Sequence, residues 1–284
     1  MKETTTHSPV AMTFRTLASG SSGNATYLRV GSTCILIDAG ISLRRIRNAL
    51  KEMGESIEEL SALIITHEHS DHIKGCASLL KARPDLPIFA TFGTKEACCE
   101  KASWASAAQI IEAQRAFAID EVEVLPFRTS HDARESVGLR FEARGAAFGF
   151  ATDLGRPTAE VIDCLQGCQA LVLEANYDEE LLLHSPYPVF LKRRIAGRGG
   201  HLSNVQARQL LKDVADEHLE TVVLGHLSDK NNTPQRAVAT VAEALHHPDD
   251  ITLVAAARLK PGPLFELRSP KSAAPLPRQA ELPI

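Results

Sequence analysis

Short apolar runs rich in β-branched residues alternate along the chain with stretches of helical spacing. Most of these runs end in a polar cluster, which is typical of buried strands that lead into loops. The predicted strands are residues 13–18, 25–30, 34–38, 62–65, 88–91, 122–130, 137–143, 146–152, 170–173, 221–224, 251–255 and 264–267. The predicted helices include residues 42–53, 71–81, 94–101, 205–217 and 234–246.

The order of these elements divides the chain into two halves that each mix strands and helices. Two sheets packed face to face, with helices outside, would bring the polar clusters to one edge. We therefore predict an α/β fold, a four-layer αββα sandwich, that forms one domain over residues 13–267. Residues 1–12 and 268–284 are expected to be flexible tails.

The densest polar cluster follows the predicted strand at residues 62–65. It contains His67, His69, Asp71 and His72, which are three imidazoles and one carboxylate. Neutral imidazole nitrogens and carboxylate oxygens suit a divalent cation such as Zn, Mn or Fe. A solvated turn with incidental histidines is the simpler alternative, but such a density of histidine at a strand end is rare by chance.

Four further strand ends carry a carboxylate or an imidazole. Asp38 could cap a turn, or it could orient a ligand histidine from behind. His131 is weak evidence alone, but beside the first cluster it becomes the obvious third imidazole for one ion. Asp153 precedes a glycine turn and could cap a helix or bridge two cations. His226 follows the predicted strand at residues 221–224.

A basic run precedes the predicted helix at residues 205–217. Residues 192–198 hold four lysines or arginines, and His201 follows a glycine-rich bend. Ser203 opens the helix with a capping box. A helix N-terminus beside basic side chains is an anion site, most simply for phosphate, although a surface patch without consequence explains the run equally well.

Composition and charge restrict the class of protein. The 284-residue chain has a formal net charge of −4, which argues against strong nonspecific adhesion to nucleic acid but not against local contacts with phosphates. Its six cysteines lack a Cys-x-x-Cys pair, so buried reduced thiols are expected. No apolar run approaches the roughly 18 residues of a membrane span, and residues 1–9 lack a signal-peptide core. We expect a cytoplasmic protein that does not contact a membrane.

Four motifs together resemble a known family. The segment 66–72 (THEHSDH) after a buried strand is similar to the signature of metallo-β-lactamase-fold hydrolases. The other segments are 19–24 (SGSSGN), 36–40 (LIDAG) and 225–232 (GHLSDKNN). Over residues 13–267 the chain resembles the bacterial YycJ/WalJ-type exonucleases of that superfamily.

The resemblance implies two divalent metal ions, with Zn or Mn expected and Fe compatible. The implied ligands are His67, His69 and His131 for one ion, Asp71, His72 and His226 for the other, and Asp153 as the bridge. Such a pair would lower the pKa of a shared water, and the hydroxide would attack phosphorus in line. The residues expected to contact substrate are Lys192, Arg193, Arg198, Ser203 and Asn232.

Three residues are expected to be catalytic. Asp71 belongs to the implied metal centre. His201 lies outside the ligand set and is the expected donor of a proton to the leaving alkoxide, as a histidine at a comparable place in the related tRNase Z nucleases is thought to be. Glu174 is the matching partner that would hold this imidazole in its useful tautomer.

The family resemblance implies a DNA exonuclease that acts from 5′ ends, with a place in DNA repair. The main alternative is a small-molecule hydrolase for a thioester, lactone or cyclic phosphodiester, because such enzymes share the ligand set. A non-catalytic adaptor with a vestigial site is disfavoured, since all seven presumed ligands are present. The sequence does not determine the native metal, the strand preference, the polarity or the oligomeric state.

Overall fold

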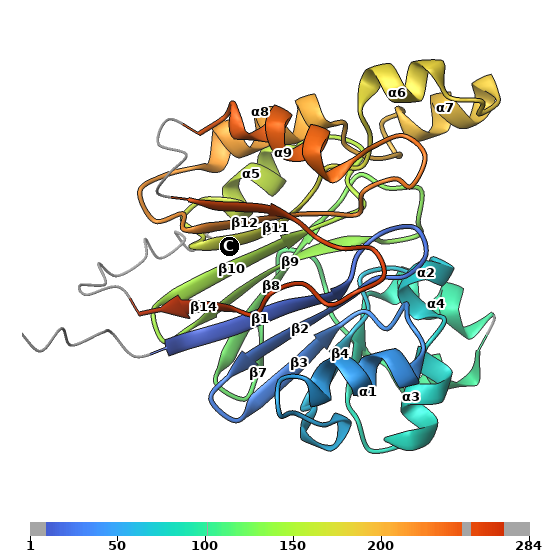
Figure 1. The fold of residues 1–284 in the computed structure, drawn as a ribbon. Coiled ribbons are helices and arrows are strands. Elements are labelled where there is room, and N and C mark those ends of the chain that lie inside the picture. Colours follow the sequence, from blue (N-terminus) through green and yellow to red (C-terminus); the bar gives the residue numbers. More distant parts are fainter. Residues whose placement is uncertain (1–9, 101, 246–250, 270–284) are drawn as a thin grey trace, which may run out of the picture.

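The computed structural model describes residues 10–100, 102–245 and 251–269. Within these ranges two mixed sheets pack face to face, and helices cover their outer surfaces (Figure 1). This is the predicted four-layer αββα arrangement. None of the helices in the described ranges has the length and apolar character needed to span a bilayer.

The first sheet contains strands from the N-terminal part of the chain and one from its end. These strands are β1 (Val10–Ala18), β2 (Ala25–Val30), β3 (Thr33–Ile37), β4 (Ala62–Ile64), β5 (Ile88–Ala90), β6 (Gln109–Ile110) and β14 (Phe265–Arg268). Their order is β14-β1-β2-β3-β4-β5-β6. The pairs from β14 to β3 are antiparallel, and those from β3 to β6 are parallel.

The second sheet has the same arrangement of antiparallel and parallel pairs. It contains the strands that lie between β6 and β14 in the sequence. They are β7 (Phe117–Ile119), β8 (Val122–Arg128), β9 (Val137–Ala143), β10 (Ala146–Ala151), β11 (Ala170–Glu174), β12 (Thr221–Gly225) and β13 (Thr252–Ala255). Their order is β13-β12-β11-β10-β9-β8-β7. The pairs from β7 to β10 are antiparallel and those from β10 to β13 are parallel, so β8, β10, β11 and β12 run in one direction.

Helices cover both outer faces, except for one pair that extends beyond the sandwich (Figure 1). The first sheet is followed or covered by α1 (Leu43–Lys51), α2 (Ser70–Ile73), α3 (Cys76–Ala82) and α4 (Phe92–Cys99), and the second by α5 (Ala159–Leu165), α8 (Asn204–Val214) and α9 (Pro234–Ala242). The extending pair is α6 (Glu179–His184) and α7 (Val189–Ile195). Two short 3-10 helices are η1 (Ile57–Glu59) and η2 (Ser103–Ala107).

Three apolar layers hold the sandwich together. Between the sheets, Phe14 of β1 stacks on Phe148 of β10 with ring centroids 4.5 Å apart. Alternate side chains of one strand reach opposite layers, because successive residues of a strand point to opposite faces. Ile35 and Ile37 of β3 enter the layer between the sheets, whereas Leu36 packs under α1 and α3. Strand β3 therefore presents apolar side chains to both faces of its sheet.

The structure corrects several predicted boundaries. Strand β1 begins at Val10 and β14 ends at Arg268, so residues 10–12 and Arg268 belong to the sheet rather than to the tails. The remaining tail residues, 1–9 and 270–284, lie outside the described residues. The helix predicted at 71–81 is two helices, because Gly75 donates its N–H to the Ala39 carbonyl oxygen at 2.8 Å and the chain turns there. Strands β6 and β7 were not predicted, since each is only two or three residues long.

Candidate metal centre

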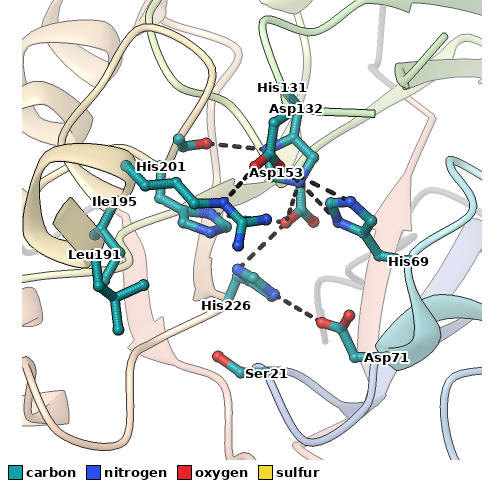
Figure 2. A pocket seen from close by; sticks show the side chains of 12 residues that line it. Ser21, His69, Asp71, His131, Asp132, Asp153, Leu191, Ile195, His201 and His226 are labelled. Carbon is teal, nitrogen blue, oxygen red and sulfur yellow. Dashed lines mark hydrogen bonds and ion pairs between the residues drawn. The ribbon is translucent and has the colours of Figure 1, made fainter. Parts of the chain in front are cut away.

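Loops from both sheets meet at one edge of the sandwich. The strands that run in the same direction in each sheet end there, namely β1, β3 and β4 in the first sheet and β8, β10, β11 and β12 in the second. Figure 2 shows His69, His131, Asp153 and His226 from these loops gathered around a pocket. Side chains that are far apart in the sequence therefore share one pocket.

Three imidazoles form the first group in this pocket. One ligand atom from each of His67, His69 and His131 lies within 4.8 Å of the others. His131 Nδ1 donates to the Gly200 carbonyl oxygen at 3.0 Å, which leaves Nε2 as an acceptor. Burial lowers the pKa of His67 and of His131. Both imidazoles are thus held in the neutral form that binds metal.

A carboxylate and two imidazoles form the second group, which consists of Asp71, His72 and His226. His226 Nε2 lies 3.3 Å from Asp71 Oδ2. His72 Nδ1 donates to Asp38 Oδ2 at 2.7 Å, so its Nε2 remains for a cation. Asp38 is buried and also accepts from the Thr66 backbone N–H at 2.9 Å. Asp38 therefore makes the contact with a strand-end histidine that its predicted orienting role requires.

Asp153 lies between the two groups. Its Oδ2 is 3.2 Å from His72 Nε2, and its Oδ1 is 3.6 Å from His131 Nε2. Both Asp153 Oδ2 and His67 Nε2 are buried and make no hydrogen bond to a residue that the structure describes. Unpartnered buried polar atoms are costly, so their convergence needs a compensating partner. A pair of divalent cations would supply it, and the residues present fit such a pair.

Three strand-end residues of the site adopt the left-handed backbone conformation. The φ angles are 60° at Asp38, 59° at Asp153 and 55° at His226. This conformation costs a non-glycine residue about 1–2 kcal/mol, and such residues concentrate at functional sites. Each turn follows directly on a buried strand, β3, β10 or β12.

Glu174 at the end of β11 connects two imidazoles of the pocket. Its Oε1 accepts from His201 Nδ1 at 2.8 Å and from His226 Nδ1 at 3.0 Å. Burial raises the pKa of Glu174, but the charge on His201 and the hydrogen bonds from both imidazoles outweigh it and lower the pKa to about 2. Burial lowers the pKa of His201, and the Glu174 charge more than reverses this. The predicted His201–Glu174 pair is present.

Another set of atoms also has the spacing of a metal site. It comprises Asp153, Glu174, His201 and His226. In this set the Nδ1 atoms of both histidines already donate to Glu174, and His201 Nε2 remains for another partner. His201 Nε2 is therefore available to move a proton or to bind metal, and the metal content of a His201 variant distinguishes the two roles.

The serine- and glycine-rich loop after β1 holds the second group in place. Ser19 Oγ accepts from the His226 backbone N–H at 2.8 Å, and Asn24 Nδ2 donates to Asp71 Oδ2 at 3.1 Å. Ser21 lines the pocket (Figure 2). The motif at residues 19–24 therefore lies at the pocket. The sequence did not reveal that Ser19 and Asn24 bind the ligand residues.

Three residues expected to contact substrate are engaged elsewhere. Ser203 is fully buried, donates to Glu179 Oε1 and caps α8 by accepting from the Gln206 backbone N–H. Asn232 is buried and donates to the Ala175 carbonyl oxygen at 2.9 Å. Lys192 Nζ donates to the Leu183 carbonyl oxygen at 2.6 Å. At the start of α8, Ser203 Oγ accepts from the Gln206 N–H and the Tyr177 carbonyl oxygen accepts from the Asn204 N–H, and the anion site expected there stays a prediction.

The basic residue in the pocket is Arg194. Arg193 and Arg198 are exposed and do not line it, whereas Arg194 does and donates from Nε to Asp132 Oδ2 at 2.6 Å. Asp132 Oδ1 lies 3.5 Å from His131 Nε2. The pocket is completed on this side by residues of α7, as Figure 2 shows for Leu191 and Ile195. In the sequence, the only indication of a role for Asp132 is that it follows the strand-end histidine His131.

Comparisons with known proteins agree on the family. A model of the β-lactamase superfamily domain matches residues 33–227. The exodeoxyribonuclease YycJ of Bacillus anthracis is 33% identical over 234 residues, which cover 82% of this chain and 88% of that protein. The exodeoxyribonuclease WalJ of Streptococcus pneumoniae serotype 2 is 32% identical over 247 residues, which cover 85% of this chain and 91% of that protein.

Solved structures share the fold at low identity. The metallo-β-lactamase fold protein YhfI from Bacillus subtilis superposes with a TM-score of 0.71 at 15% identity, covering 91% of this chain and 100% of its own. The Zn²⁺-bound PqqB from Methylobacterium extorquens gives 0.66 at 16% identity, covering 90% and 100%. The predicted metallo-β-lactamase fold is confirmed.

The exonuclease relatives and the fold make the protein a metal-dependent hydrolase. The chain belongs to the β-lactamase superfamily and, within it, to the family of the YycJ and WalJ exodeoxyribonucleases.

Proposed function

We propose that the protein is a dinuclear-metal-dependent phosphodiesterase that digests DNA from 5′ ends and serves DNA repair. The choice of DNA is supported by the relatives named exodeoxyribonucleases that match most of the chain. The observation that carries the metal chemistry is the meeting of buried, unpartnered His67 Nε2 and Asp153 Oδ2 among further imidazoles in one pocket.

The ligand assignment follows the groups in the pocket. His67, His69 and His131 would hold one ion, Asp71, His72 and His226 the other, with Asp153 between them. Two divalent cations supply an acidified water as nucleophile and neutralise the charge that grows on the phosphate in the transition state. Zn and Mn both suit imidazole and carboxylate ligands without thiolate, and Fe is compatible.

His201 is the proposed donor of a proton to the leaving alkoxide. Its Nδ1–H donates to the buried Glu174, so Nε2 is the nitrogen left to carry and release the proton. Glu174 fixes the tautomer and the ring orientation, and it accepts from the Leu154 and Leu202 backbone N–H groups at 2.9 and 3.0 Å, which hold it in place. The four contacts to one carboxylate make this orientation rigid.

A digestion ladder tests this function. The purified protein is incubated with 5′- and 3′-labelled single- and double-stranded DNA in Mn and in Zn, alongside a panel of thioesters and lactones. We expect metal-dependent shortening from 5′ ends that is absent in Asp71→Ala. Rapid cleavage of a thioester or lactone with intact DNA would instead favour the small-molecule hydrolase. Shortening from 3′ ends would overturn the polarity alone.

A further inference from the structure

Helix α7 exposes apolar side chains beside the pocket. Phe190 is 73% exposed, the highest value among the large hydrophobic residues in the described ranges, and its neighbour Val189 is 62% exposed. None of the residues of α7 is buried. Figure 1 shows α6 and α7 reaching beyond the sandwich. A short helix without a buried face gains little from packing, and exposed apolar surface of this kind is typical of an interaction site.

The same helix also forms one wall of the pocket. Leu191, Arg194 and Ile195 line it, as expected for positions i, i+3 and i+4 on one helix face. Phe190 lies one turn from Arg194 and three positions before Arg193. The exposed face of α7 that carries Phe190 therefore borders the face that lines the pocket. A polymer that leaves the pocket past Arg194 would next reach Phe190 and Arg193.

The charges of this region favour a polyanion. Arg193 and Arg198 are exposed, and neither side chain makes an ion pair or hydrogen bond to a residue that the structure describes. The acidic residues of the neighbouring α6 are occupied, since Glu179 accepts from Ser203 Oγ and Glu180 pairs with Arg236. The helix itself contains no acidic residue. Positive charge is thus free on α7, although the whole chain carries a net charge of −4.

We propose that the exposed side of α7 binds the substrate strand, with one base stacked on Phe190 and one phosphate held by Arg193. This inference rests on the proposed nuclease function. An aromatic face takes any base, and an arginine beside it neutralises the backbone, which is the usual way of gripping a single strand without regard to sequence. The grip would keep the strand threaded into the pocket between successive cuts.

The test compares Phe190→Ala and Arg193→Gln with matched exposed residues elsewhere. Phe92, 62% exposed at the start of α4, and Arg47 on α1 supply the controls Phe92→Ala and Arg47→Gln. Binding of a labelled single-stranded oligonucleotide is measured with Asp71→Ala in the background, so that the strand is not digested. The parallel assay is hydrolysis of bis(p-nitrophenyl) phosphate, a phosphodiester without a nucleotide chain.

We expect Phe190→Ala to weaken oligonucleotide binding about tenfold, the loss of one base stack, and Phe190→Trp to restore it. Arg193→Gln should lower the slope of log affinity against log salt by about 0.7. Both α7 variants should hydrolyse the small phosphodiester at the wild-type rate. The two control variants should bind the oligonucleotide with wild-type affinity.

Three results would count against the proposal in different ways. Oligonucleotide binding that is normal in both α7 variants overturns this inference and leaves the nuclease function intact. A wild-type protein that binds and digests no oligonucleotide overturns the proposed function itself. A wild-type dimer in sedimentation that Phe190→Ala dissociates, with unchanged strand binding, shows that α7 is covered by a second copy of the chain instead.

Discussion

Glu174 is a single carboxylate that organises two histidines with different proposed roles. Its two oxygens accept four hydrogen bonds, from the imidazoles of His201 and His226 and from the Leu154 and Leu202 backbone N–H groups. These donors keep it ionised in a fully buried position. Movement of this side chain would disturb a proposed metal ligand and the proposed proton donor together.

His201→Ala separates the two roles. We expect the variant to keep its metal content and to lose about 100-fold or more in kcat, because general acid catalysis contributes about 10²–10⁴-fold. KM should change little, since the imidazole is not proposed to bind the substrate. Metal analysis and steady-state kinetics on labelled DNA are the measurements. His131→Ala is the comparison that should lose metal, and loss of metal from His201→Ala would identify His201 as a ligand.

Asp38→Asn tests whether the hydrogen bond from His72 to Asp38 contributes to metal binding. Asp38 accepts from His72 Nδ1 and from Thr66, so an amide leaves one of these donors facing another donor. We expect metal affinity to fall about 10–100-fold, as is usual when such a partner is removed. Competition with a chromogenic chelator measures it. Asp163→Asn, on the exposed surface of α5, should bind metal normally, and an equal affinity for Asp38→Asn would refute the role.

At the scale of elements, the site is built by loops that pack on each other. Gly40, in the loop between β3 and α1, donates its N–H to the Asn24 carbonyl oxygen at 2.7 Å, and Asn24 donates its own backbone N–H to the Asp71 carbonyl oxygen at 2.7 Å. The loops after β1, β3 and β4 are therefore joined through their backbones. The position of Asp71 depends on this contact, which leaves no space for a side chain.

Gly40→Ala should break this contact. A methyl group at Gly40 would lie 1.5 Å from the Asp71 carbonyl oxygen, which is backbone and has no free rotation to escape. We expect a loss of about 3 kcal/mol or more in the free energy of unfolding, together with weaker metal binding. Chemical denaturation measures the first. Gly54→Ala, where nothing lies within 4 Å, should cost only about 1–2 kcal/mol for its positive φ.

At the scale of the whole molecule, the proposed centre joins the two sheets. His67, His69, Asp71 and His72 follow β4 of the first sheet, while His131, Asp153 and His226 follow strands of the second. The apolar layer between the sheets already holds them together, with Phe14 stacked on Phe148. Bound metal would therefore stabilise a sandwich that also exists without it.

Chelation should lower the melting temperature without unfolding the protein at ambient temperature. A ligand present at 100 times its Kd stabilises by about 2.7 kcal/mol, which corresponds to about 5–10 °C for a chain of this size. Differential scanning calorimetry before and after chelation measures the shift, and far-ultraviolet circular dichroism should stay unchanged. In Asp71→Ala the shift should be smaller. An identical melting temperature with and without metal would argue against a centre that bridges the sheets.

The sequence by itself determined the longer strands, the fold and the polar residues that cluster at one edge of the sheets. Apolar strands can be recognised from a few neighbouring residues. The meeting of the polar residues at their ends follows from the rule that strands running in the same direction end at one edge of the sheet. The capping box at Ser203 and the orienting role of Asp38 were equally local, and both are present. The resemblance to the exonuclease family depended on the same segments.

Only the tertiary structure decided which polar side chains face the pocket. Successive residues of a helix point about 100° apart, so the basic run could not show that Arg194 lines the pocket while Arg193 does not. Ser203 and Asn232 are turned inward by contacts with α6 and the loop after β11, which are distant in sequence. Orientation about an axis depends on long-range packing, and no residue pattern within one element specifies it.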